Sequence, residues 1–195
     1  MEKLLENYEL SGTLLNIHTY PDPVLTKIAQ KVEKFDEELK TLCLNMLYTM
    51  YHAPGIGLAA PQVGISQRIF VIDVEYDREE TSEDSGEYTL SNFKPLIFIN
   101  PIIKDSSGEK TYQEGCLSLP GVYEDVKRFD EITVEYQDTD GNTHEISATE
   151  LLCICIQHEN DHLEGIVFLD RLSPLKKNFF KKKLIKAKKQ KSHNL

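Results

Sequence analysis

The chain has 195 residues, four cysteines and a formal net charge of −10 at pH 7. This length suits one domain with a sizeable core, and no stretch approaches the roughly 20 apolar residues of a membrane-spanning helix. Its acidic start resembles neither a signal peptide nor a transit peptide. Four cysteines in a chain of this size do not suggest a disulfide framework. We therefore expect a cytoplasmic protein with neither a membrane nor DNA as a partner.

Helical spacing dominates residues 24–52. Leu25, Ile28 and Ala29 begin one run, and a second run has apolar residues at intervals of three and four. The second run consists of Leu39, Leu42, Cys43, Met46, Leu47 and Met50. We expect N-terminal helices here, with this stripe in the core and Cys43 as an inert buried thiol.

Strands follow the helical region. Residues 68–74, R-I-F-V-I-D-V, predict a buried strand, and residues 96–101 predict another that ends at its proline. Residues 75–94 between them are polar and acidic, so we expect an exposed hairpin tip or loop and assign it no function. Residues 132–136 and 143–146 flank D-T-D-G-N, which predicts a hairpin.

A helix beginning after Thr149 carries the sequence Q-H-E-N-D-H-L-E-G at residues 157–165. Residues four positions apart share one face of a helix, so His158 and His162 can bind one divalent ion. Glu159 then stays free to move a proton. This combination is typical of a metal-dependent hydrolase.

The third metal ligand has to come from upstream. Phe168 stands where one class of metallopeptidases has a third histidine, and no glutamate follows Glu164. Cys116 stands out because the glycines and proline of E-G-C-L-S-L-P-G indicate a constrained turn that can aim a thiolate at a metal. Two imidazoles, one thiolate and an open fourth position would make a catalytic rather than a structural site. The other upstream candidates are Cys43, His18, His52, His144 and several carboxylates.

Three motifs, in this order, resemble the signatures of the peptide deformylase family. They are G-I-G-L-A-A-P-Q at 55–62, E-G-C-L-S at 114–118 and Q-H-E-N-D-H at 157–162. The resemblance implies an α+β fold, with antiparallel β-strands packed around a central metal-binding helix, N-terminal helices and a C-terminal helix. It also implies one catalytic domain over residues 1–175 and a basic helical extension over 176–195.

The activity implied by this resemblance is removal of the N-terminal formyl group from formyl-methionine of newly synthesised polypeptides, with release of formate. Cys116, His158 and His162 would hold one divalent metal ion. In the family this ion is natively Fe2+, and Zn2+, Ni2+ or Co2+ can replace it. The sequence does not choose among them, because imidazole and thiolate suit all four.

The resemblance also assigns roles around the metal. Glu159 would be the general acid–base, and the side chain of Gln62 and the backbone N–H of Leu117 would stabilise the oxyanion. Gln62 has the alternative of satisfying a local turn. The residues implied to contact the substrate are Ile56, Gly57, Leu151, Ile154 and Cys155. Apart from Gly57, whose backbone would pair with the peptide, these are equally ordinary core residues.

Basic residues concentrate at the C-terminus. Residues 176–195 contain nine lysines and no acid, which leaves a net charge of −19 on residues 1–175. Residues 175–191 predict an amphipathic basic helix, similar to the helix by which bacterial deformylases dock on the ribosome near the exit tunnel. The alternative is a solvated tail that aids solubility.

Two other functions remain open at this point. His158 and His162 with Glu159 also fit a metallopeptidase that cleaves internal peptide bonds, for which Cys116 would not be a ligand. A non-enzymatic ribosome-binding protein with a decayed site would be expected to lack Gln62, Glu159 or a ligand. All of these residues are present.

Overall fold

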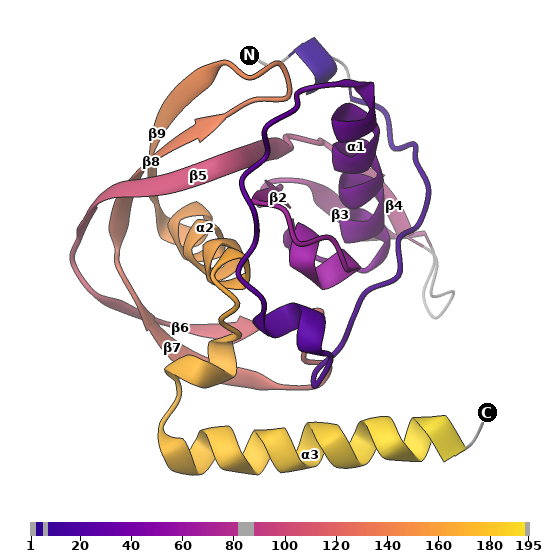
Figure 1. The fold of residues 1–195 in the computed structure, drawn as a ribbon, viewed down its shortest axis with the longest axis vertical. Coiled ribbons are helices and arrows are strands. Elements are labelled where there is room, and N and C mark those ends of the chain that lie inside the picture. Colours follow the sequence, from indigo (N-terminus) through magenta and orange to yellow (C-terminus); the bar gives the residue numbers. More distant parts are fainter. Residues whose placement is uncertain (1–2, 6–7, 82–87, 194–195) are drawn as a thin grey trace.

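The computed structural model describes residues 3–5, 8–81 and 88–193 and shows antiparallel strands around one helix (Figure 1). The strands are β1 Gly57–Ala59, β2 Ile69–Ile72, β3 Asp77–Glu80, β4 Tyr88–Ser91, β5 Leu96–Ser107, β6 Lys110–Gly115, β7 Tyr123–Arg128, β8 Glu131–Gln137 and β9 Thr143–Thr149. The main sheet has the order β1-β2-β5-β8-β9, while β3–β4 and β6–β7 form separate hairpins. The expected α+β fold is therefore confirmed.

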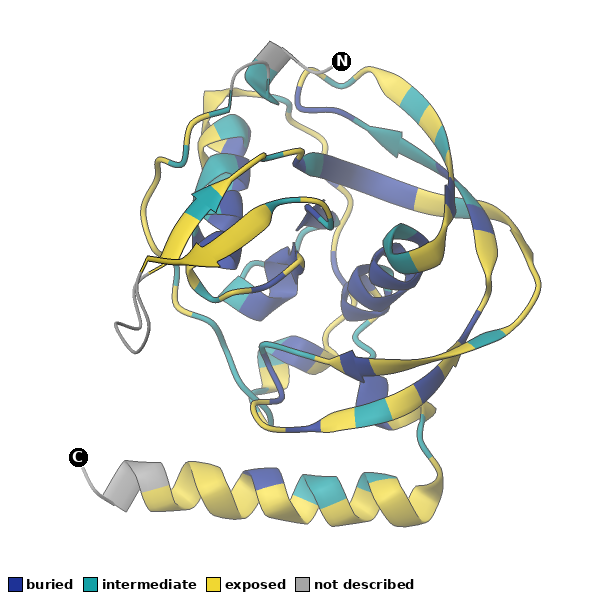
Figure 2. Ribbon diagram, turned by 180° about the vertical axis from the view of Figure 1, so that it is seen from behind, coloured by how far each residue is buried: buried dark blue, intermediate teal, exposed yellow. Residues whose placement is uncertain are grey.

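The central helix is the one that carries the two predicted histidine ligands. The helices are α1 Glu37–His52, α2 Glu150–Leu163 and α3 Pro174–His193, with 3-10 turns η1 Lys3–Leu5, η2 Pro23–Thr26, η3 Ala60–Val63 and η4 Phe168–Arg171. Most of α2 is buried, whereas α3 is mostly exposed over residues 174–190 (Figure 2). No helix in the described ranges has the length and apolar character needed to cross a bilayer.

Strand β2 explains how the helices are placed, because both of its faces are buried. Ile69 and Val71 pack in one cluster with α1, whereas Phe70 and Ile72 pack in another with α2. Successive side chains of a strand point to opposite faces of the sheet. The continuous apolar run in this strand therefore lets one sheet separate α1 from α2.

The first predicted helical run does not form as expected. Helix α1 begins after Asp36, whose carboxylate accepts the N–H of Leu39 at 3.0 Å as an N-cap, and its apolar stripe is buried as predicted. Upstream, however, η2 ends at Thr26 and Ile28 is 64% exposed. The N–H of Ala29 donates instead to a carbonyl at the end of α2, at Leu163. The expected helical run with Leu25, Ile28 and Ala29 was therefore wrong beyond Thr26, because backbone bonds to distant residues hold the chain there outside a helix.

The predicted end of a strand at Pro101 was also wrong. Strand β5 continues to Ser107, and its pairing with β8 shifts register between Ile99 and Ile102. Asn100 has a φ of 51° there, and its side chain bonds both backbone groups of Val32. A proline lacks the N–H that a regular ladder needs, but a register shift tolerates it.

Both predicted hairpins are present. Strands β8 and β9 pair down to Gln137 and Thr143, and the Asp138 carboxylate accepts the N–H groups of Asp140 and Asn142. This is the usual role of aspartate in a tight turn. The acidic segment pairs as β3 and β4, with its tip outside the described residues.

Glu150 begins α2 in a conformation that glycine would adopt more easily. Its φ is 53°, and the preceding Thr149 occupies the N-cap position without a side-chain capping bond. A non-glycine residue in this left-handed region costs about 1 kcal/mol. The Glu150 carboxylate also pairs with Lys110 at 3.3 Å.

We therefore expect Glu150→Gly to be more stable than Glu150→Ala by about 1 kcal/mol in the free energy of unfolding. Both variants lose the pair with Lys110, so their difference isolates the backbone conformation. At an ordinary helix position glycine is instead less stable than alanine by about 1 kcal/mol. Urea unfolding followed by circular dichroism would measure the difference, and an alanine variant at least as stable as the glycine variant would contradict the assignment.

Candidate metal centre and active site

Two histidines from α2 and one cysteine from the end of β6 meet in space. Potential ligand atoms of Cys116, His158 and His162 all lie within 4.8 Å of one another, and Cys116 Sγ is 3.3 Å from His162 Nε2. Two ligands of a tetrahedral zinc ion lie roughly 3.5 Å apart, given bonds of about 2.0–2.3 Å. The spacing and the donor types therefore fit one divalent ion with a fourth position open to a substrate or water.

The other upstream candidates for the third ligand lie elsewhere. Cys43 is a buried residue of α1, and the three histidines have other partners: His18 with Asp22, His52 with the Tyr48 carbonyl and His144 with Asp138. Among the residues that the structure describes, Cys116 with the two helix histidines is the group arranged to hold a metal.

A buried carboxylate orients one of these histidines. Glu114 Oε2 lies 2.7 Å from Nδ1 of His158. Arg128 donates to both carboxylate oxygens, at 2.6 Å to Oε1 and 2.8 Å to Oε2. Burial alone would raise the pKa of Glu114, but hydrogen bonds from Arg128 and His158 outweigh it and lower the pKa to about 2. The carboxylate is thus ionised at neutral pH. It accepts a hydrogen bond from Nδ1–H of His158, which leaves Nε2 of that ring available to a metal.

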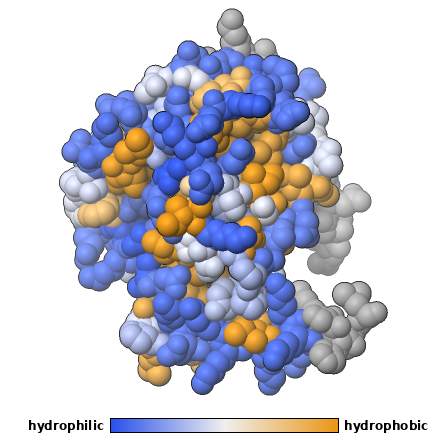
Figure 3. All heavy atoms as spheres, viewed as in Figure 1, coloured by the Kyte–Doolittle hydropathy of each residue, from blue (hydrophilic) through white to orange (hydrophobic). Residues whose placement is uncertain are grey.

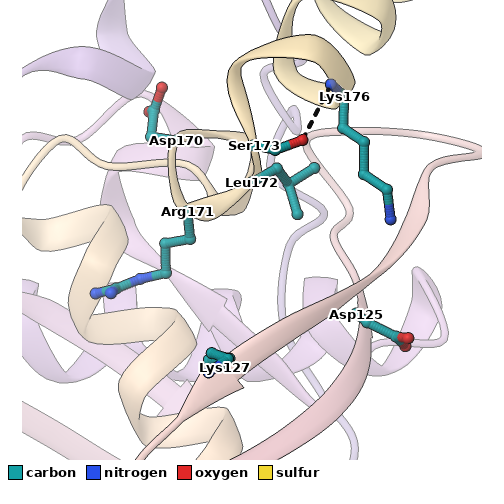
Figure 4. A pocket seen from close by; sticks show the side chains of 7 residues that line it. All are labelled: Asp125, Lys127, Asp170, Arg171, Leu172, Ser173 and Lys176. Carbon is teal, nitrogen blue, oxygen red and sulfur yellow. Dashed lines mark hydrogen bonds between the residues drawn. The ribbon is translucent and has the colours of Figure 1, made fainter.

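The charge network continues from Arg128 to η4, the turn that precedes α3. Asp161 of α2 accepts from Arg128 at 2.6 Å and from Nε of Arg171 at 2.5 Å. Arg171 reaches from η4 toward α2 along the wall of a second cleft (Figure 4). Glu114, Arg128 and Asp161 have at most 7% of their side chains exposed. The two guanidinium groups thus balance the two buried carboxylates. A buried carboxylate without such a partner would destabilise the fold strongly.

A cavity of about 670 Å³ opens beside the metal ligands. Its lining includes these predicted site residues: Ile56, Gly57, Gln62, Cys116, Leu117, Leu151, Ile154, Cys155, His158 and Glu159. His162 is not part of the lining but contacts Cys116. The structure therefore brings together every residue that the sequence placed at the site.

Sequence reasoning missed part of the wall. Tyr112, Leu119, Val122 and Tyr123 also line the cavity, and the hairpin β6–β7 that carries several of them was not predicted. Its strands are short and mostly exposed, so they lack an apolar pattern. The available signal was the spacing of Tyr112 and Glu114, because side chains two residues apart lie on the same face of a strand.

Glu159 is a buried carboxylate in the lining of the cavity. It is 3% exposed, and its Oε2 has no hydrogen-bond partner in the described structure. Burial raises the pKa of Glu159 to about 7. A Cβ atom added at Gly57 would lie 2.5 Å from Glu159 Oε1 and 2.8 Å from Cys155 Sγ. Only glycine fits between the cavity and this carboxylate.

Gln62 serves the local turn and the cavity together. Its Oε1 accepts the N–H of Ala59 at 2.8 Å, which satisfies the turn at η3. This bond directs Nε2 to the other side, 3.6 Å from Cys116 Sγ and 3.3 Å from Ser118 Oγ. The two alternatives considered for this residue are thus compatible.

We expect Glu114→Gln to weaken metal binding by about 10- to 100-fold, the usual effect of losing a carboxylate behind a histidine ligand. Competition with a chelator would measure zinc affinity, with circular dichroism confirming that the variant is folded. Glu124→Gln is the matched control, because Glu124 pairs with Lys176 at the surface. Equal zinc affinity in the two variants would contradict the assigned role of Glu114.

Comparisons with known proteins agree with this geometry. A family model described as polypeptide deformylase matches residues 14–178. A peptide deformylase of Novosphingobium aromaticivorans is 47% identical over 177 residues, which cover 87% of this chain and 94% of that protein. The crystal structure of a peptide deformylase from Legionella pneumophila has a TM-score of 0.79 at 43% identity and covers 92% of this chain and 98% of its own. One from Synechococcus elongatus, in complex with actinonin, has a TM-score of 0.74 at 44% identity, covering 87% and 86%. The chain therefore belongs to the polypeptide deformylase family.

Proposed function

We propose that this chain removes the formyl group from the N-terminal formyl-methionine of new polypeptides, with a divalent ion held by Cys116, His158 and His162. One observation carries the proposal: Cys116 and His158 of the Cys–His–His donor set border the same cavity as Glu159, whose Oε2 has no hydrogen-bond partner in the described structure. A zinc-type peptidase acting on internal bonds gains no support, because the third donor is the upstream Cys116.

The protein groups are placed for hydrolysis of an amide. Cys116, His158 and His162 would hold the divalent ion, which would supply Lewis acidity and a water molecule of lowered pKa, about 7. Glu159 accepts a proton from the attacking water and returns it to the leaving amine. Gln62 Nε2 and the backbone N–H of Leu117 donate to the oxyanion that develops on the formyl oxygen.

The cavity also accounts for selection of formyl-methionine. A formyl carbon carries only hydrogen, so a small site admits it and excludes bulkier acyl groups. Ile56, Leu151, Ile154 and Cys155 form an apolar wall for the methionine side chain. Strand β1 is the edge of the main sheet, so the backbone of Gly57 can pair with the peptide as an added strand.

We take Fe2+ as the native ion, with Zn2+, Ni2+ or Co2+ as replacements, since the donor set accepts all four. The reaction belongs in the cytoplasm, where formylated nascent chains arise. In this proposal residues 1–175 form the catalytic domain, and residues 176–195 form an extension that meets the ribosome.

The exposed surface of α3 suits an anionic partner such as ribosomal RNA near the exit tunnel. Six of its exposed residues are lysines, and Leu175 and Phe179 are 82% and 63% exposed. Hydrophilic and hydrophobic atoms both show on the surface at the lower end of the molecule, where α3 lies (Figure 3). Over residues 174–190, Leu184 is the one buried residue of this helix, packed in an apolar cluster of the body. Residues 1–175 carry a net charge of −19 and would repel the phosphate backbone of RNA, so α3 is the surface that would meet it.

The activity is tested by hydrolysis of formyl-Met-Ala-Ser, with acetyl-Met-Ala-Ser as the control substrate. We expect the iron- or nickel-loaded protein to release formate and to leave the acetyl peptide intact. Glu159→Ala should lower kcat by about 10²–10⁴ while the metal stays bound, because only the proton transfer is lost. Cys116→Ala should lose the metal. A Cys116→Ala protein that keeps its metal and its activity would exclude this site.

Docking by α3 is tested by co-sedimentation with ribosomes. Reversing the charge of Lys182, Lys183 and Lys186 to glutamate should abolish co-sedimentation, and wild-type binding should weaken with increasing salt. Lys104→Glu on β5 is the control and should bind as the wild type does. Undiminished binding by the triple variant would leave α3 as a solubility tail.

A further inference from the structure

Residues 18–22, here called the strap, join the two segments that carry the proposed oxyanion donors. The N–H of His18 donates to the carbonyl of Gln62 at 2.7 Å, and the N–H of Tyr20 donates to the carbonyl of Ser118 at 2.9 Å. Gln62 Nε2 also donates to Ser118 Oγ at 3.3 Å. The strap, the turn at η3 and the loop after β6 thus form one hydrogen-bonded unit.

The side chain of His18 closes this strap. Its Nδ1 donates to Asp22 Oδ2 at 2.8 Å, and the same carboxylate caps η2 by accepting the N–H of Val24. The imidazole also lies against Gly64, the residue that ends η3: a Cβ atom there would come within 2.8 Å of Nε2. His18 therefore contacts the turn that carries Gln62 through both its backbone and its ring.

We propose that His18 is a positioning residue for Gln62, an inference that rests on the role in oxyanion binding proposed above. His18 does not line the cavity, so it acts through Gln62 and not on the substrate. Pairing with Asp22 fixes the strap, the strap fixes the Gln62 carbonyl, and the side-chain amide is thereby aimed at the formyl oxygen. A displacement of about 1 Å at such a donor can cost up to 10²-fold in rate.

The strap is supported from outside as well. It lies between the body and α3 (Figure 1), where Lys188 Nζ donates to the Thr19 carbonyl at 2.8 Å. Tyr20 packs in the same apolar cluster as Leu184 of α3. The strap is therefore held on both sides, and the His18–Asp22 pair is the side-chain bond within it.

The first experiment compares His18→Ala, His18→Asn and His144→Ala on formyl-Met-Ala-Ser, with equal metal content. We expect His18→Ala to lower kcat by about tenfold with KM within about twofold. His18→Asn should return kcat to within about twofold of wild type, since its amide nitrogen can replace Nδ1 as donor to Asp22. His144→Ala is the matched control, because it removes a similar pair, with Asp138 at 2.7 Å, from a remote hairpin. It should leave kcat unchanged.

The second experiment is a double-mutant cycle with Gln62→Ala. If His18 acts through Gln62, His18→Ala should change kcat by less than about twofold once Gln62 is gone. An equal loss in both backgrounds, or no loss in either, would overturn the proposal. Should His18→Ala fail to fold, Asp22→Asn, which keeps the cap on Val24 and weakens the bond to His18, is used in its place. A wild-type protein without deformylase activity would overturn the proposed function instead.

Discussion

The site depends on one buried interaction, the bond between the Glu114 carboxylate and Nδ1 of His158. Without compensation, burial would favour the neutral form of this carboxyl group. Arg128 provides the compensation, and Asp161 in turn balances Arg128. Because these groups come from β6, β7 and α2, the same charges that orient the metal ligand also join the separate hairpin to the central helix. The same buried charges therefore both orient His158 and connect the hairpin β6–β7 to α2.

The second requirement of the site is that the backbone of β1 approaches Glu159 closely. The cavity lies between the edge strand β1 and the loop after β6, and Gly57 leaves no space for a side chain beside Glu159. This contact keeps Glu159 buried beside β1, the edge strand of the sheet. A Cβ at this position would clash with Glu159 Oε1 and Cys155 Sγ.

Much of this arrangement follows from local sequence. Helical spacing is enough to place His158 and His162 on one face, and the turn around Cys116 is recognisable from its glycines and proline. The extended path after Thr26 and the passage of β5 through Pro101 were not recognised, because partners far along the chain determine both. Arg128 was missed for a related reason: an arginine on a mostly exposed strand has the same local pattern whether it faces water or two buried carboxylates. Predicting such a partner requires the tertiary pairing of β6 with β7 and of both with α2.

Helix α3 is attached to the body at both ends, and this bears on whether it is only a solubilising tail. Near its start, Lys176 pairs with Glu124 of β7 at 2.7 Å. Near its end, Lys188 bonds the Thr19 carbonyl in the strap beside Gln62. A tail that served only to keep the protein in solution would need neither attachment, since its lysines would act equally well on a free chain. Held at these two points, α3 presents its lysines and exposed apolar residues in one orientation relative to the body, which the proposed docking on an anionic partner would require.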